Sequence, residues 1–263
     1  MLWRYGRREV FASKMVTAVF TLSFAPILVV AILLYLRHNA PVLQAMDVDA
    51  ADLLAVDGRL FAILLRIQAA FAFVITALVG PGLVAPDLGN NGLALYLARP
   101  FSRSEYVLGK LSVLLILTSL VTWVPLLVLW LLQAGLEPAW AGQNLRSAMA
   151  IFVGAWIWIG FLALLALALS AWVRWRVVAA ALLVVVVIVA SSLAEMINAM
   201  FETVWGDVFS PGRLVLGIWE TLFHAQAWSA RIPLPAAVIA FLAMCGLCLL
   251  VLDRKLRAYE VVR

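Results

Sequence analysis

The chain of 263 residues is far more apolar than a soluble domain of its length. Hydrophobic residues make up 66% of the chain and charged residues 13%, whereas a soluble domain carries roughly 25% charged and about 45–50% apolar residues. Little polar sequence is left for a separate soluble domain. The composition therefore predicts a single domain that folds in lipid.

The basic balance of the chain predicts contact with lipid head groups. Its net charge is +5, which in a soluble protein would raise the question of nucleic acid. No aromatic–basic recognition motif for nucleic acid accompanies the charge, so nucleic-acid binding is not expected. Basic loops of membrane proteins set their topology and meet anionic lipids instead.

Six apolar runs are each long enough to cross the membrane as a helix, which takes roughly 20 residues. They occupy residues 15–36, 60–84, 107–132, 147–173, 177–194 and 232–252. Their apolar residues are continuous rather than alternating, which excludes the strands of a membrane β-barrel. The prediction is an all-α integral membrane fold with six transmembrane helices.

The distribution of basic residues predicts the orientation of these helices. With the N-terminus in the cytoplasm, Lys14, Lys110 and Lys255, the three lysines of the chain, all fall in cytoplasmic segments, as do most arginines. The first outer loop is acidic instead. This bias is typical of multi-pass membrane proteins. We expect both termini in the cytoplasm and the chain in the plasma membrane, in bacteria the inner membrane.

Two segments outside the spans have patterns of their own. Residues 1–14 alternate aromatic and basic side chains, which favours an amphipathic helix on the cytoplasmic surface, the alternative being a disordered basic tail. Residues 195–231 contain two apolar stretches separated by Pro211-Gly212, each too short to span. They predict an outer re-entrant or interface-lying helical hairpin before the last span.

Several kinds of catalytic and binding motif are missing from the sequence. The two histidines, His38 and His224, lie in outer segments, and Cys245 and Cys248 lie inside an apolar run, where they are interpreted as small apolar helix residues. Neither a Gly-x-Ser-x-Gly turn nor a Gly-x-x-x-x-Gly-Lys-Ser/Thr loop is present. We expect no catalytic residue, metal or cofactor in this chain.

Arg66 lies one or two turns into the second predicted span, whereas Lys110, the other charge within the predicted spans, lies at the very start of the third. Ionisable residues within a membrane often line a cavity or a transport path. Arg66 is therefore a candidate cavity-lining residue. The alternative is an arginine near the outer end of its helix whose side chain extends to the head groups.

The segment between the second and third spans has the most unusual sequence. Gly80–Pro86 is expected to loosen and end the second helix, and Asp87–Gly92 is rich in turn residues. Gly92–Ala98 can form a short helix that Arg99-Pro100 stops. Residues 87–105 are therefore expected to form a stiff cytoplasmic knob between two spans, suited to docking into a groove of a soluble partner.

This segment resembles the permease subunits of type-2 ABC transporters, the exporter-like class. The pattern is carried by Asp87, Leu88, Leu93, Leu95, Tyr96, Leu97, Arg99, Pro100, Ser102, Arg103, Glu105, Tyr106, Gly109 and Lys110. Strong similarity is confined to this segment, and the layout of surface helix, six spans and outer hairpin is similar over the rest. The permeases of copper-enzyme-maturation and multidrug systems are the most similar branches. No path of Met, His and Cys is present, which argues against conduction of copper itself.

The resemblance implies a non-catalytic subunit driven by a partner. Residues 87–105 would couple it to two copies of a separate ABC ATP-binding subunit, which would hold the ATP and Mg²⁺, and a second permease copy would complete a homodimer. The implied coupling residues are Asp87, Leu88, Gly89, Asn90, Leu93, Leu95, Tyr96, Leu97, Arg99, Pro100, Arg103 and Glu105. Two alternatives stay open: a membrane scaffold or sensor without transport, and a lipid-handling enzyme that uses the acids of the first outer loop.

Overall fold

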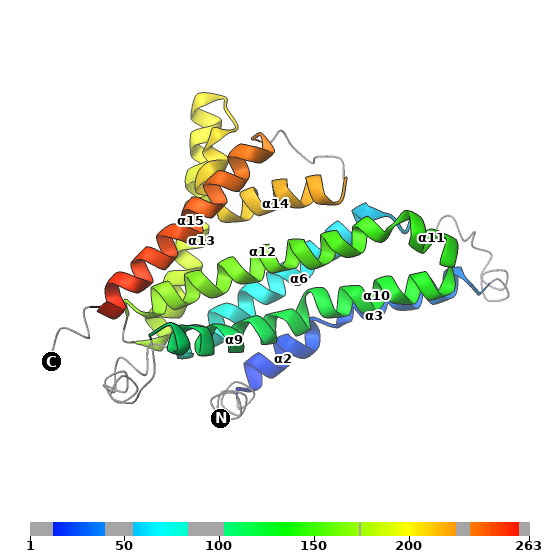
Figure 1. Cartoon of the computed structure of the whole chain (residues 1–263), viewed down its shortest axis with the longest axis horizontal. Helices are drawn as coiled ribbons and strands as arrows, with labels where there is room; N and C mark the ends of the chain where they lie inside the picture. Colours follow the sequence, from blue (N-terminus) through cyan, green and yellow to red (C-terminus); the bar gives the residue numbers. More distant parts are fainter. Residues whose placement is uncertain (1–12, 40–54, 84–102, 174, 225–231, 258–263) are drawn as a thin grey trace.

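The computed structural model describes residues 13–39, 55–83, 103–173, 175–224 and 232–257. Within these ranges the protein is helical and has no strand (Figure 1). Six helical segments are long and apolar enough to cross a membrane, which confirms the predicted all-helical fold and its six candidate spans. They are Lys14–Arg37, Gly58–Leu83, Val107–Leu136, Leu145–Ser170, Arg176–Phe201 and Leu234–Lys255.

The first span is two helices, α2 (Lys14–Leu22) and α3 (Ala25–Arg37), rather than one. Pro26 lies in the first turn of α3 and has no N–H to continue the ladder from α2. The side chain of Gln68, on the neighbouring helix α6 (Gly58–Val79), donates from Nε2 to the carbonyl of Ser23 over 2.8 Å. The carbonyl of Ser23, at the break, thus has a hydrogen-bond partner on another helix. Such a partner is needed because the membrane interior has no water to bind it.

Replacement of Gln68 by leucine tests how much this contact stabilises the break. Gln68 is fully buried, and side-chain hydrogen bonds between membrane helices contribute about 0.6 kcal/mol on average and up to about 1.7. We expect a loss of about 1 kcal/mol in the free energy of unfolding in detergent. Gln143→Leu, at an exposed position, is the control. Equal effects of the two substitutions would contradict this role.

The third span also contains a break. Helices α9 (Arg103–Val121) and α10 (Trp123–Leu136) meet at Thr122. The hydroxyls of Thr118 and Thr122 donate to the carbonyls four residues earlier, over 2.7 and 2.8 Å, and Pro125 follows directly. Such bonds and proline bend helices. The short helix α11 (Pro138–Gln143) then leads into the fourth span.

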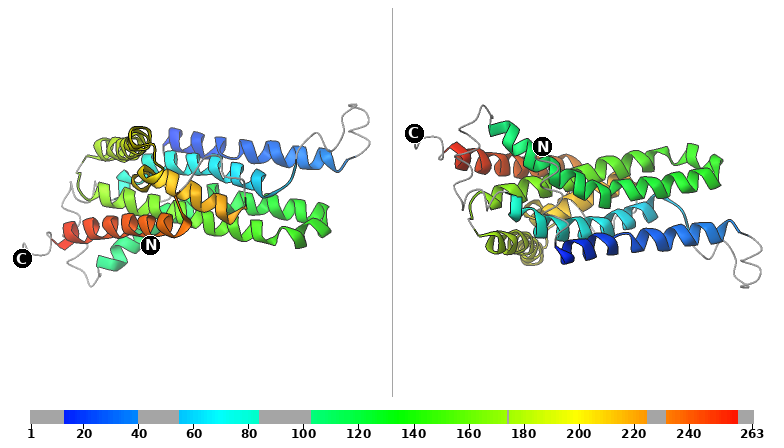
Figure 2. Two further views of the ribbon diagram at one scale, coloured as in Figure 1. Left: turned by 90° about the horizontal axis from the view of Figure 1, so that it is seen from above. Right: turned by 90° about the horizontal axis from the view of Figure 1, so that it is seen from below.

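Helix α12 (Leu145–Ser170) is the centre of the bundle. It packs against α6, α9, α10, α13 (Arg176–Phe201), α14 (Pro211–Leu222) and α15 (Leu234–Arg257), and it runs through the middle of the views in Figures 1 and 2. Its side chains Ile151, Ile159 and Leu162 are fully buried. A helix that is apolar on all sides is expected in such a place.

Helix α13 crosses the bundle at a steep angle and projects beyond it, so that Figure 2 shows it nearly end-on. It continues to Phe201, past the boundary expected at residue 194, because no helix breaker occurs before Glu202. Glu202 ends the helix in the left-handed conformation, with a φ of 47°. The first part of the segment expected as a hairpin, 195–231, is therefore the last two turns of α13.

The described remainder of that segment, residues 202–224, folds back onto the bundle. A short 3-10 helix, η1 (Trp205–Phe209), packs on α13, and α14 lies along α12. Arg146 on α12 donates to the carbonyls of Thr221 and Leu222 over 3.2 and 3.1 Å. That this segment enters the membrane stays a prediction. The predicted surface helix at the N-terminus also stays a prediction, because residues 1–12 lie outside the described residues.

Candidate functional site

Most of the predicted coupling residues lie outside the part of the chain that the structure describes. Residues 87–100 fall in this gap, while Arg103 begins α9 and Glu105 is exposed in its first turn. An acidic residue in the first turn complements the positive end of the helix. What the structure gives is the frame on either side of the segment: the end of α6 and the start of α9.

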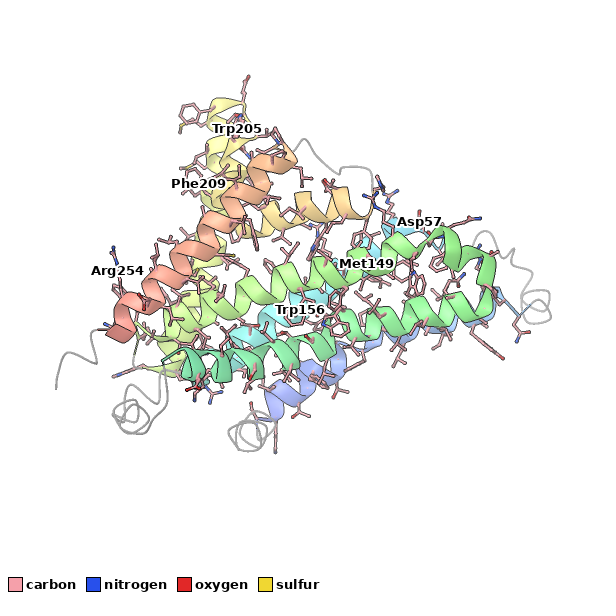
Figure 3. The ribbon with its side chains drawn as sticks, in the orientation of Figure 1. Asp57, Met149, Trp156, Trp205, Phe209 and Arg254 are labelled. Atoms are coloured by element: carbon pink, nitrogen blue, oxygen red, sulfur yellow. The ribbon has the colours of Figure 1, made fainter. Side chains whose placement is uncertain are left out.

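These two helix ends lie at the basic end of the bundle, which we define by Lys14, Lys110, Arg176, Arg254 and Lys255. Arg254 marks this end in Figure 3, while Asp57 lies toward the opposite end, where its side chain accepts from the N–H of Leu60 and caps α6. All three lysines are thus at one end of the bundle. That this end faces the cytoplasm stays a prediction from the positive-inside rule.

A compact apolar cluster packs the end of α6 against the second half of α9. It includes Val79 and Leu83 from α6 and its extension and Val113 and Leu114 from α9, with further residues from α2, α12, α13 and α15. Gly80 allows the close approach, because a Cβ there would lie 2.8 Å from the Cβ of Ala166 on α12. The sequence predicted that Gly80 helps to end the second helix, and α6 ends at Val79, directly before it. In the structure Gly80 also lets α6 approach α12 closely.

Two hydrogen bonds fix the last turn of α6 to the corner between α12 and α13. The hydroxyl of Ser170 donates to the carbonyl of Pro81 over 3.1 Å, and the Arg176 guanidinium donates from Nη2 to the carbonyl of Leu78 over 3.1 Å. The last carbonyls of a helix have no partner within it. We call Ser170, Arg176 and these two carbonyls the clamp.

The same corner reaches the end of α15. The ammonium of Lys255 lies 5.1 Å from the centroid of the Trp172 ring, within the range of a cation–π interaction. Trp172 belongs to the turn between α12 and α13. The ends of α6, α12, α13 and α15 therefore meet at one place, next to the segment predicted to couple.

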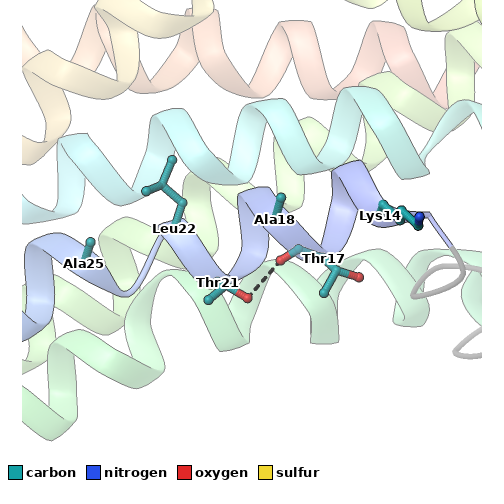
Figure 4. A pocket seen from close by; sticks show the side chains of 6 residues that line it. All are labelled: Lys14, Thr17, Ala18, Thr21, Leu22 and Ala25. Atoms are coloured by element: carbon teal, nitrogen blue, oxygen red, sulfur yellow. Dashed lines mark hydrogen bonds between the residues drawn. The ribbon is translucent and has the colours of Figure 1, made fainter.

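An open groove of about 730 Å³ runs along α2 near its start. Figure 4 shows its lining, in which the hydroxyl of Thr21 donates to the carbonyl of Thr17 over 3.0 Å. The lining residues are Lys14, Thr17, Ala18, Thr21, Leu22 and Ala25. Arg66, the predicted cavity-lining residue, is exposed on α6 and is not part of this groove. Its role stays a prediction.

Among the described residues, no group of three His, Cys, Asp or Glu side chains could hold a metal ion. Neither protein-family models nor curated proteins give a match to this chain. The frame around the predicted coupling segment is thus the best-defined candidate site.

Sequence reasoning missed the clamp residues of this site. Ser170 was part of an apolar run and Arg176 was counted only as a topology signal. The one available sign was that Arg176 immediately precedes a long apolar run with no acidic residue near it in the sequence. Its partner, a backbone carbonyl 98 residues away, has no signature in sequence.

Proposed function

We propose that this chain is the membrane permease subunit of an ATP-driven type-2 ABC transporter. The observation that carries the proposal is the motif in residues 87–110, placed between the second and third spans. The structure supports it with six helices apolar enough to span and with a packed frame of helix ends on both sides of the motif.

In this proposal the chain is not catalytic. ATP and Mg²⁺ bind to a separate ATP-binding subunit, present in two copies, and a second copy of this chain completes the complex in the bacterial inner membrane. Residues 87–105 dock as a short helix into a groove of that subunit, with Leu93 and Leu97 as apolar anchors. Closure of the ATPase subunits then moves the ends of α6 and α9, which drives export or mechanical transmission.

The topology follows from the same proposal. The basic end and both termini lie in the cytoplasm, where residues 1–14 form an interfacial helix. The segment that contains η1 and α14 then lies on the outer side, as a hairpin that enters the membrane before the last span. Its N-terminal half rests on α13, and its C-terminal half rests on α12.

The direct test is co-purification of an ATPase from native membranes in mild detergent. Wild-type protein is expected to elute with an ATP-binding subunit and ATPase activity. The variant Tyr96→Ala/Arg99→Glu removes an aromatic contact and reverses a charge, and because like charges across an interface cost several kcal/mol, we expect at least about a tenfold loss.

The matched control is Tyr35→Ala/Arg37→Glu, which makes the same chemical change at the opposite end of the bundle, where Tyr35 is exposed. This variant should retain the ATPase. If no ATPase associates with the wild-type protein, the proposed function is wrong, and the scaffold and enzyme hypotheses take its place. Equal losses in the two variants would place the docking surface elsewhere.

A further inference from the structure

We propose that Ser170 and Arg176 are positioning residues that make α13 follow the end of α6 when the coupling segment moves. This inference rests on the proposed function and adds a second transmission path to it, from α6 through the clamp into the fifth span. Neither residue belongs to the motif, and neither would touch the ATPase or a substrate for this role.

The two bonds bind carbonyls three residues apart, at the end of α6 and just after it. Ser170 is the last residue of α12 and Arg176 the first of α13, and they bind the carbonyls of Pro81 and Leu78. The guanidinium also lies against Gly82, where a Cβ would be 3.1 Å from Nε. Both partners are backbone groups, so a displacement of the α6 backbone acts directly on the start of α13.

The location of the clamp favours transmission over a merely local contact. It holds the last described turn of α6, directly before the segment that is proposed to receive the push. A positive side chain at the carbonyl end of a helix is also favoured by the helix dipole. The N–H donors of the guanidinium are held in one plane, whereas the lysine ammonium rotates freely. Arginine therefore fixes the position of the Leu78 carbonyl and also supplies a positive charge.

Helix α13 packs against η1, α12 and α14 as well as α6, but most of its surface is exposed. In its apolar window 17% of residues are buried, against 67% in α12, and its packing against α6 is slight compared with that of α12. The start of α13 contacts the end of α6 through the clamp and through Leu183, which shares an apolar cluster with Val79, so a shift of α6 acts on this end of α13. The steep angle of α13 then converts a small shift of its start into a larger one at its projecting end (Figure 1).

The first measurement tests the clamp itself, in purified protein without nucleotide. Arg176→Met keeps the side-chain length and removes the donors. Because one hydrogen bond contributes about 1 kcal/mol, amide exchange of residues 79–83 should rise about fivefold. Arg254→Met, which removes an exposed arginine at the same basic end, should leave it unchanged, and Arg176→Lys should fall between. Equal exchange in Arg176→Met and Arg254→Met would overturn the proposal.

The second measurement tests transmission in the complex with its ATPase. Spin labels at Met149 and Met196 report the separation of α12 and α13, and labels at Val74 and Leu120 that of α6 and α9. All four positions are exposed, and the labels are placed in a background free of Cys245 and Cys248. We expect ATP to shift both distances in the parent, whereas in Arg176→Met the α6–α9 shift persists and the α12–α13 shift falls at least twofold.

The outcomes separate the two proposals. An α12–α13 shift that survives Arg176→Met would overturn the clamp as a transmission path and leave the permease function standing. If ATP does not change the α12–α13 distance in the parent although the ATPase is bound, the clamp is likewise overturned as a transmission path and the permease function still stands. If no ATPase co-purifies with the parent, the proposed function fails and this inference fails with it. Ser170→Ala should act in the same direction as Arg176→Met: amide exchange of residues 79–83 should be faster, and the ATP-dependent α12–α13 shift should be smaller.

Discussion

Asp207→Ala is expected to destabilise the protein by about 2–4 kcal/mol, because it removes a buried carboxylate that accepts hydrogen bonds from two side chains, one of them charged. The side chain of Asp207 is 3% exposed. Its Oδ1 accepts from Asn198 Nδ2 over 2.9 Å and from Arg213 Nη1 over 3.2 Å. The carboxylate thereby joins α13, η1 and α14, all three at one buried point.

The matched control is Glu195→Ala, which removes a carboxylate from the same arginine. Glu195 Oε2 lies 3.5 Å from Arg213 Nη2, but its side chain is 75% exposed. Exposed pairs of this kind contribute about 0–1 kcal/mol. The free energy of unfolding, taken from an SDS titration followed by circular dichroism, should therefore separate the two variants clearly. If they lose the same amount, the buried position of Asp207 has no special role.

An intermediate variant refines the argument. Asp207→Asn keeps the shape and an oxygen that can accept from Asn198, but it removes the charge facing Arg213. Its destabilisation should lie between those of the other two variants. The loss should also appear locally, as faster amide exchange in residues 203–210, since Asn198 Oδ1 accepts from the N–H of Gly206 over 2.7 Å in the same cluster. Faster exchange spread evenly over the bundle would contradict a local role.

The spans could be predicted because hydropathy depends only on neighbours in sequence. Each of the six apolar runs lies in a long helical segment, two of which are broken into two helices, and the segment ends are shifted by a few residues. The largest shift is at the end of α13, where the helix runs on to Phe201. Its end depends on the left-handed conformation of Glu202, which the chain adopts as it turns back into η1. Hydropathy does not report that turn.

The breaks and the clamp could not be predicted, because they depend on which helices become neighbours. Pro26 indicates where the first span bends, but the Gln68 side chain that satisfies Ser23 comes from another helix. The partners Ser170 and Pro81 are likewise far apart in sequence. The predicted coupling segment is the reverse case: its sequence is distinctive, but the structure describes only the helices on either side of it.

Gly154→Val is expected to cost about 2–4 kcal/mol, from overpacking at about 1–3 kcal/mol and one lost buried hydrogen bond at about 1 kcal/mol. A Cβ at Gly154 would lie 2.9 Å from Trp219 Nε1 and 3.1 Å from Leu65 Cδ2. The indole donates to the carbonyl of Gly154 over 2.9 Å, and Trp219 is buried. The substitution therefore pushes α14 away from α12 and breaks the bond that joins them.

Gly160→Val is the matched control on the same helix. A Cβ at Gly160 meets nothing within 4 Å, and both substitutions exchange glycine for the same β-branched residue, so the change in helix propensity is shared. Gly160→Val should stay within about 0.5 kcal/mol of the parent. A comparable loss at both positions would assign the effect to the helix backbone. A loss confined to Gly154 would show that α14 is fixed to the bundle by this contact, and that the segment after α13 is an integral layer of the fold.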